Sequence, residues 1–358
     1  MGQALRVAPT SNRIGLFGSL TLPFFVLFTL MAAHFTFAAS VTADPAERLL
    51  PFEYFARAMI AGIWPILAFV LWVGILLPVR RVENPTRAML AVLQRNRFWA
   101  IRSLILFAAM MPTALSFVAI KNAIPALVPF YLDPPLVQLD RILFLGFDPW
   151  QITHAVIGEQ GTRFLDWAYV AWSVPATLLV LWACFDRNPR FQFASVFTLF
   201  CCWVGLGNVL AILLSSVGPI FYEQFYGASD FVPLMANLPA DLNLHTSKAF
   251  LLDAYGRGDF GSGISAAPSL HVAITMLIFI MLRDKFRNRA ITLLASAYVA
   301  LIFVGSIHLA WHYAIDGIIS LIAVPLFWKL AHWLMSSGYL RSSPGDAHEG
   351  AGSSSLPM

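Results

Sequence analysis

Long apolar stretches separated by short polar segments dominate this chain. A membrane-spanning helix needs about 20 largely apolar residues, and eight windows of the sequence have that length and character. The pattern therefore predicts an all-α polytopic membrane protein with about eight transmembrane helices. The expected spans are 14–39, 58–79, 101–120, 165–185, 193–215, 264–282, 290–308 and 314–335.

Two intervals between these windows have a pattern of their own. Asn84 and Pro85 are typical of a helix cap and a first helical residue, and Arg residues alternate with apolar ones after them. This predicts a short basic helix on the inner membrane interface. The segment 122–164 is apolar but too broken by Pro to span, so we expect it to lie along the outer interface. The Ser- and Gly-rich tail after Ser336 is typical of disorder.

Composition supports a membrane location. Hydrophobic residues make up 59% of the 358 positions and charged residues 12%, whereas soluble domains have roughly 45 to 50% and about 25%. A water-soluble globule is therefore excluded. The three cysteines, Cys184, Cys201 and Cys202, lie in apolar runs and predict neither a disulfide framework nor a metal site.

Lys and Arg are distributed by membrane side. The first window follows Arg6 and Arg13 and is too long for a cleavable signal, so we expect an anchor whose N-terminus is cytoplasmic. Alternation from that start places sixteen of the 23 Lys and Arg residues in cytoplasmic segments. We predict a plasma-membrane protein with both termini in the cytoplasm and no nucleic-acid partner. The remaining basic residues, on the outer side, are Arg48, Arg57, Lys121, Arg141, Arg163, Lys248 and Arg257.

Polar residues meet at the outer ends of the last three spans. The string Ala267-Pro268-Ser269-Leu270-His271 opens the sixth span after a Gly-rich approach, and His308, His312 and Asp316 cross the short connection between the seventh and eighth. Ionisable residues are costly within or beside membrane helices. Because alternation of sides places all of these residues at the same surface, the sequence predicts a functional site there.

The spacing suggests what this site could do. Residues four apart are neighbours on a helix, so Asp316 can accept a hydrogen bond from one ring nitrogen of His312 and leave the other nitrogen as a nucleophile or base. Pro268 suits the first turn of a helix. The N–H groups of Ser269, Leu270 and His271 would then be free to bind phosphate.

The two motifs resemble the second and third signatures of the type 2 phosphatidic acid phosphatase superfamily. Within it, Leu270 and the string His312-Tyr313-Ala314-Ile315-Asp316 look more like the inositol phosphorylceramide synthase (inositolphosphotransferase) branch. The resemblance covers about residues 100–335, which would form a six-helix catalytic core. Residues 1–13 would then be a cytoplasmic N-terminus, 14–99 two additional helices with the basic loop, and 336–358 the cytoplasmic tail.

This resemblance implies an enzyme of phospholipid metabolism in the bilayer, a lipid phosphatase or phosphotransferase that acts on a lipid phosphate or phospholipid at the outer membrane face. It makes His312 the nucleophile, Asp316 its orienting carboxylate, and His271 the acid that protonates the leaving group. A phosphohistidine would form, with neither metal nor cofactor. The phosphoryl group would pass to water or to an alcohol, such as a sphingoid or another lipid.

The chain departs from the family pattern where the phosphate is normally held. Ala211 and Gly218 stand at the Lys and Arg of the first signature, and Ser306 stands at an Arg of the third. Positive charge must therefore come from elsewhere, and Arg257 in the approach to His271 is the candidate, because guanidinium can grip phosphate through two hydrogen bonds. The other expected substrate-binding residues are Ser269, Leu270 and His308.

Three other interpretations stay open. His308, His312 and Asp316, each four residues apart, could together hold a metal ion. The same group could relay protons in a transporter. It could also be a structural cluster that holds helices together. The pattern makes no prediction of oligomeric state.

Overall fold

The computed structural model describes residues 11–41, 71, 84–258 and 263–339. This part of the chain is 82% helical without any strand. It contains six candidate spans with the length and apolar character needed to cross a membrane. The all-α polytopic fold is thereby confirmed. The expected span 58–79 lies outside the described residues except for Leu71.

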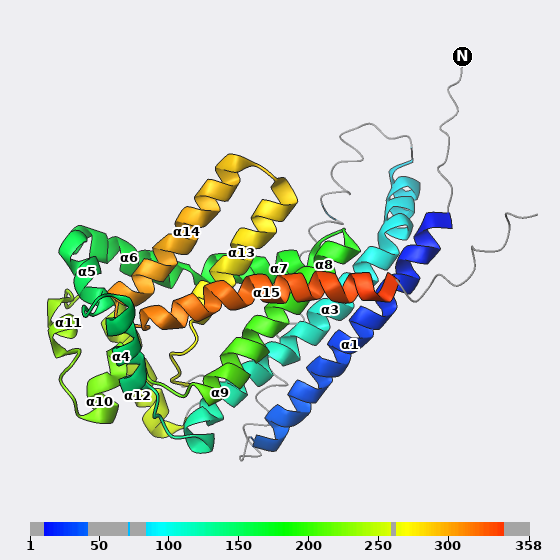
Figure 1. Ribbon diagram of the computed structural model, residues 1–358. Helices are drawn as coiled ribbons and strands as arrows, with labels where there is room; N and C mark the ends of the chain where they lie inside the picture. The colour runs from blue at the N-terminus through cyan, green and yellow to red at the C-terminus, as the bar shows by residue number, and fades with distance from the viewer. Residues whose placement is uncertain (1–10, 42–70, 72–83, 259–262, 340–358) are drawn as a thin grey trace, which may run out of the picture.

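Long helices form the body of the molecule (Figure 1). Helix α1 (Ser11–Val41) packs against α3 (Pro85–Leu127) and α15 (Ala314–Tyr339), and α15 also packs against α8 (Pro189–Phe200). Apolar side chains from these helices and their neighbours form one large buried cluster. A polar contact joins α1 to this body, since His34 Nε2 lies 2.9 Å from Asn208 Oδ1.

The basic segment after Asn84 does not form a separate helix. Helix α3 begins at Pro85, with Asn84 at the N-cap, and continues for 43 residues to Leu127. The prediction of a short interfacial helix before the third span is therefore wrong. The residues between the basic segment and the span are Phe98, Trp99 and Ala100. Since none of them is Gly or Pro, nothing in the sequence ends the helix there.

Two expected spans are built from more than one helix. Helices α6 (Glu159–Ala171) and α7 (Ser173–Phe185) meet at Trp172. Pro175 lies in the first turn of α7 and has no N–H to bond back to Ala171, which explains the interruption. Helix α8 passes through a π-helical segment, η1 (Cys201–Leu210), into α9 (Ala211–Leu213).

Helices α13 (Leu270–Phe286) and α14 (Arg289–His308) form an antiparallel pair, and α15 returns beside α13 (Figure 1). The span expected at 264–282 begins later, because Ser269 is the N-cap of α13. Pro268 thus precedes the helix, and the prediction that it occupies the first helical turn is wrong.

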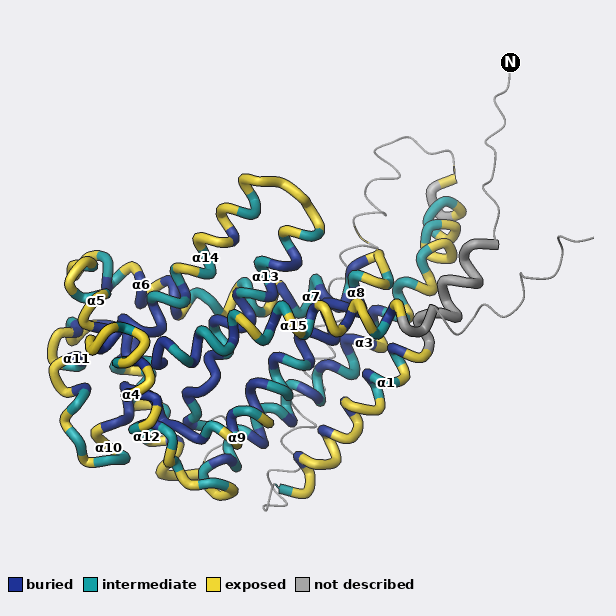
Figure 2. Tube along the Cα trace, in the orientation of Figure 1, coloured by how far each residue is buried: buried dark blue, intermediate teal, exposed yellow. Residues whose placement is uncertain are grey.

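Short helices gather at one end of the molecule (Figure 1). The segment 122–164 contributes α4 (Asp133–Leu143) and α5 (Pro149–Val156) after the end of α3. The segment between α9 and α13 contributes η2 (Pro219–Phe221), α10 (Tyr222–Tyr226), α11 (Val232–Asn237) and α12 (Asn243–Arg257). Their inner sides carry a second buried apolar cluster (Figure 2). This end cap covers the starts of α13 and α15.

Candidate active site

A cavity of 380 Å³ lies between α3, the α6–α7 junction, the approach to α13 and the loop 309–313. His271 and His312 both line it, as do the polar side chains of Lys121 and Asn122. The rest of the lining is largely apolar and includes Phe117, Val118, Tyr169, Trp172, Phe221, Leu251 and Trp311. The structure thus brings together two histidines that are far apart in the sequence, within a pocket suited to an amphiphile.

His271 is held between two aromatic rings. Its ring centroid lies 4.3 Å from that of Tyr169 and 4.2 Å from that of Trp172. The Trp172 indole N–H donates to the His271 carbonyl oxygen at 3.2 Å, so the α6–α7 junction holds the first turn of α13. The ring centroids of His271 and His312 are 6.2 Å apart. The two imidazoles are therefore close enough to act on one group bound in the cavity.

His312 lies just before α15 and not within a helix. Its Nδ1 is 3.4 Å from Oδ2 of the fully buried Asp316. Asp316 is the third residue of α15, and its Oδ2 also accepts from the Tyr313 N–H at 3.1 Å, as in half of a capping box. The structure therefore places the two groups at ion-pair distance, with the Asp316 carboxylate on the Nδ1 side of the His312 ring.

Two aspartates of α4 hold the loop that carries His312. Asp140 accepts hydrogen bonds from the N–H groups of Ala314 (2.7 Å) and Ile315 (2.9 Å), the first residues of α15. Burial raises the pKa of this carboxyl to about 6, although the two bonds oppose the shift. Asp133 accepts from the Tyr313 hydroxyl at 2.9 Å and from the Gly218 N–H at 2.8 Å. No motif in the sequence indicated either carboxylate.

The positions where the family pattern has basic residues are buried or tightly packed here. Gly218 has a φ of +85°, and a Cβ placed on it would lie 2.8 Å from the Trp311 carbonyl oxygen. Ser306 is fully buried, and its hydroxyl donates to the Phe303 carbonyl oxygen at 2.7 Å. Ala211 is also buried. The absence of these basic residues is therefore built into the packing around the cavity.

Lys121, near the end of α3, brings the missing charge to the cavity. Of the described residues that line the cavity, it is the one Lys or Arg. The backbone of Gly263 lies directly against it, since a Cβ there would be 2.8 Å from both the Lys121 carbonyl carbon and Cγ. From the sequence, Lys121 was expected among the outer basic residues, without a predicted role. Lys121 follows a long apolar run on the same membrane side as the histidines, and this position could have indicated a role in the site.

Other expected site residues lie elsewhere. Arg257 is the last residue of α12, where it is exposed and forms an ion pair with Asp253 at 2.7 Å, and it does not line the cavity. The ring nitrogens of His308 are 2.8 Å from Thr162 Oγ1 and 3.1 Å from Thr153 Oγ1, outside the cavity lining.

Of the two phosphate-binding residues expected at the start of α13, one lines the cavity and one does not. Leu270 lines the cavity. Ser269 does not, and its N–H donates to the Asp316 carbonyl oxygen at 3.2 Å. That N–H is therefore not free for phosphate. The bond instead ties the start of α13 to the first turn of α15.

The metal interpretation required His308, His312 and Asp316 to converge. The loop 309–313 interrupts the helix between the first two of them. Within the described ranges, no three His, Cys, Asp or Glu residues lie close enough together to hold a metal ion. The described geometry therefore does not favour a metal ion over the histidine pair.

The arrangement so far defines a multi-helix membrane protein with a paired-histidine cavity. Comparison with protein-family models matches residues 134–330 to the PAP2 superfamily. Since the match covers more than half of the chain, this protein belongs to that superfamily, whose members are generally phosphatases and phosphotransferases. Neither the curated proteins nor the solved structures give a match.

Proposed function

We propose that this protein cleaves the phosphoester of an amphiphilic substrate and passes the phosphoryl group to water or to an alcohol. His312 Nε2 attacks phosphorus while the bond from phosphorus to the leaving oxygen breaks, and His271 gives that oxygen its proton. Water or the acceptor alcohol then attacks the phosphohistidine, and His271 takes back a proton. Asp316 holds His312 in the tautomer with Nδ1 protonated.

One observation carries this proposal. His271 and His312 line the same 380 Å³ cavity, and the Asp316 carboxylate lies 3.4 Å behind the reactive histidine. The rings of Tyr169 and Trp172 restrict the orientation of the His271 imidazole. Its ring nitrogens can therefore exchange a proton with a substrate in the cavity. Phosphoryl transfer through histidine requires a nucleophile, an orienting group and an acid, and His312, Asp316 and His271 would fill these roles.

Lys121 is the residue we assign to the phosphate. Charge accumulates on the nonbridging oxygens during transfer, and a fixed cation beside them lowers the barrier. The lining residues around it, among them Phe117, Leu251 and Trp311, would contact the apolar part of the substrate. We assign the catalytic core to about residues 100–335, which includes Lys121 although the family match begins at residue 134.

The finer assignments concern the acceptor and the membrane face. Leu270 in the cavity wall and the string from His312 to Asp316 support a transferase of the inositolphosphotransferase type, with a phospholipid as donor and a sphingoid or other lipid as acceptor. The distribution of Lys and Arg supports an outward-facing cavity in the plasma membrane, with both termini inside.

Incubation of the purified protein with a panel of phospholipids tests the proposal. Mass spectrometry of free phosphate and of new lipid species separates a phosphatase from a transferase. The variant His312→Ala should give neither product and no phosphohistidine. The variant His271→Ala should still form phosphohistidine from p-nitrophenyl phosphate, since that leaving group needs no proton. Normal turnover in His312→Ala would refute the mechanism.

A further inference from the structure

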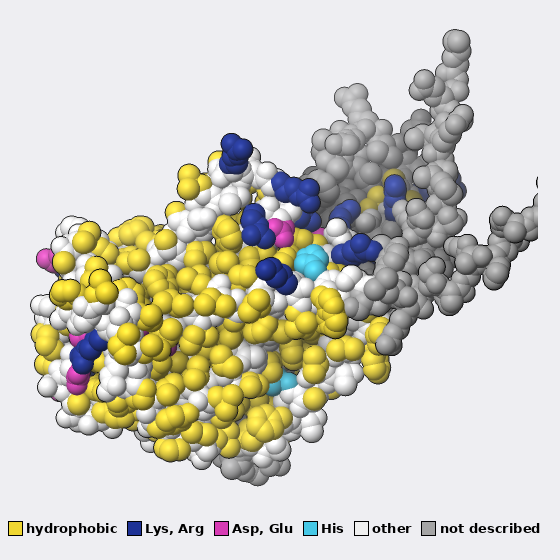
Figure 3. All heavy atoms as spheres, in the orientation of Figure 1, with side chains coloured by type: hydrophobic (Ala, Val, Ile, Leu, Met, Phe, Trp, Pro, Cys, Tyr) yellow, Lys and Arg dark blue, Asp and Glu magenta, His cyan; other side chains and the backbone are white. Residues whose placement is uncertain are grey.

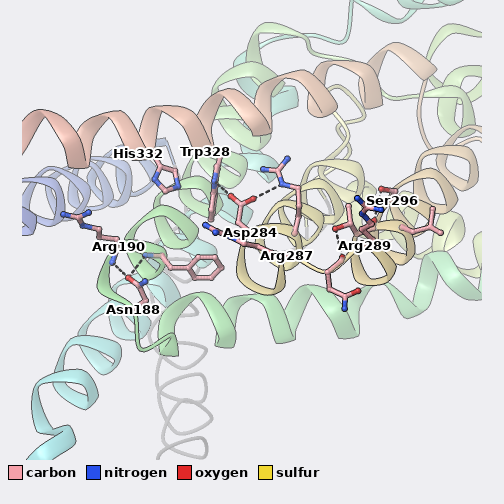
Figure 4. A pocket seen from close by; sticks show the side chains of 13 residues that line it. Asn188, Arg190, Asp284, Arg287, Arg289, Ser296, Trp328 and His332 are labelled. Atoms are coloured by element: carbon pink, nitrogen blue, oxygen red, sulfur yellow. Dashed lines mark hydrogen bonds and ion pairs between the residues drawn. The ribbon is translucent and has the colours of Figure 1, made fainter.

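A second, larger cavity lies at the other end of the helices that form the active site. Its volume is 800 Å³, and it lies between the start of α8, the α13–α14 turn and the last part of α15 (Figure 4). Helix α13 runs from the active site at Leu270 to this cavity at Phe286. The residues that line it include Arg190, Arg283, Asp284, Arg287, Arg289 and Trp328.

Positive charge dominates the lining. Four arginines, at positions 190, 283, 287 and 289, face one carboxylate among the described lining residues, that of Asp284. This carboxylate is already engaged, because Oδ1 accepts from Arg283 Nε at 2.8 Å and Oδ2 accepts from the Trp328 indole N–H at 3.0 Å (Figure 4). Arg287 and Arg289 are exposed and form no ion pair with a described residue. The cavity is therefore suited to an anion.

Backbone geometry places these charges. Arg287 ends α13 with a left-handed φ of 49°, which is uncommon for a residue with a side chain. Helices α8 and α14 both begin at this cavity, where Asn188 accepts from the N–H groups of Arg190 and Phe191, and Asn288 from those of Ala290 and Ile291, so the helix dipoles act here and not these N–H groups. Helix N-termini favour anions, and Arg283 in the last turn of α13 offsets that helix's negative end.

The surroundings favour a lipid over a soluble anion. Phe191, Leu293 and Trp328 give the cavity an apolar side next to its arginines. On the visible face of the molecule, most Lys and Arg side chains gather near the α13–α14 turn, and the surface below them is mainly hydrophobic (Figure 3). A lipid could place its phosphate among the arginines and lay its chains along that surface.

We propose that this cavity binds the phosphate head group of an anionic lipid, in the leaflet opposite the catalytic cavity. Guanidinium groups bind phosphate oxygens through paired hydrogen bonds, so the four arginines suit a lipid phosphate. This site is separate from the histidine cavity and holds no group that the proposed reaction uses, so the inference does not depend on the proposed function.

The test uses the full chain in nanodiscs of neutral phosphatidylcholine with a small fraction of phosphatidylglycerol. Native mass spectrometry should show phosphatidylglycerol retained by the wild type. In the double variant Arg287→Gln/Arg289→Gln, its apparent affinity should fall at least about tenfold, since each lost charge-assisted bond costs more than a neutral one. Circular dichroism in neutral nanodiscs shows that the variant is folded.

The matched control removes the same charge from the same end of the molecule. Arg87 and Arg95 are exposed on α3 and do not line the cavity, so Arg87→Gln/Arg95→Gln should change the affinity less than twofold. An equal loss in this control would mean that general surface charge attracts the lipid, and would overturn the proposal. Displacement of the lipid by millimolar inorganic phosphate would also overturn it, because the ligand would then be a soluble anion.

Discussion

Lys121 shows how one residue can replace a charge that the packing excludes elsewhere. At Gly218 a Cβ would already lie 2.8 Å from the Trp311 carbonyl oxygen, and Ser306 is fully buried. The cavity receives its cation instead from α3, a helix that lies before the matched family region.

We therefore expect Lys121→Ala to lower kcat/KM by about 10² to 10³, the usual cost of removing one donor to a developing oxyanion. Lys121→Arg should retain part of the activity, because the charge remains but the longer side chain meets Gly263. Steady-state kinetics measure both effects. Lys248→Ala is the matched control, since that residue does not line the cavity. Wild-type turnover in Lys121→Ala would remove this residue from the site.

Asp316 is a finer probe than either histidine. Asp316→Asn keeps the size of the side chain and can still accept from the Tyr313 N–H, but it removes the charge behind His312. By analogy with other oriented histidines, turnover should fall by roughly 10⁴. The assay is repeated with EDTA, to which the wild type should be insensitive. Loss of wild-type activity in EDTA would instead support a metal site.

At the residue scale, the motifs predicted the histidine pair and its carboxylate but not their support. Pro268 to His271 and His312 to Asp316 carry a local spacing that can be recognised in one chain. Asp133 and Asp140 have no such spacing, because their partners, the N–H groups of Gly218 and Ala314, are more than 80 residues away. Long-range hydrogen bonds to backbone leave no local pattern.

At the scale of elements, the first turn of α15 depends on a carboxylate from another helix. Asp140 accepts from its first two N–H groups, and burial raises the pKa of Asp140 to about 6. The folded state therefore holds the Asp140 proton more tightly than the unfolded chain does. The stabilisation of the folded state by protonated Asp140 is therefore fully present below about pH 4, and it is lost as the pH rises through about 6.

We predict that the thermal midpoint of the wild type falls over this pH range relative to that of Asp140→Asn, which cannot ionise there. Differential scanning fluorimetry in detergent at a series of pH values measures the difference. Asp253→Asn, an exposed carboxylate on α12, should follow the wild type. Parallel pH curves for the wild type and Asp140→Asn would contradict this account.

Among the described elements, the expected spans follow from apolar length, whereas their joints depend on single residues. The windows at 290–308 and 314–335 agree with α14 and α15 to within a few residues. Composition alone did not show that the basic segment continues into α3, or that Trp172 separates α6 from α7. The first depends on the absence of Gly or Pro between the basic segment and the span, and the second on Pro175 in the first turn of α7.

At the scale of the whole molecule, the two cavities lie at opposite ends of the helices, and both contain polar residues. If the positive-inside rule sets the orientation, the histidine end faces outward. Ser229 is exposed in the end cap, and Ala290 is exposed near the α13–α14 turn. In intact cells, Ser229→Cys should react with an impermeant thiol reagent, and Ala290→Cys should react only after lysis. The wild type, whose three cysteines lie in apolar helices, is the control. The opposite labelling would place the catalytic cavity in the cytoplasm.

Helix α13 connects these two ends with 17 residues. At 1.5 Å per residue it is about 25 Å long, whereas the hydrocarbon core of a typical bilayer is about 30 Å thick. Most side chains in the middle of α13 are buried against neighbouring helices, so this length is fixed by the protein and not by the lipid around it. At least one end of α13 then lies inside the hydrocarbon core, so the cavity at that end would be reached through the bilayer rather than from water.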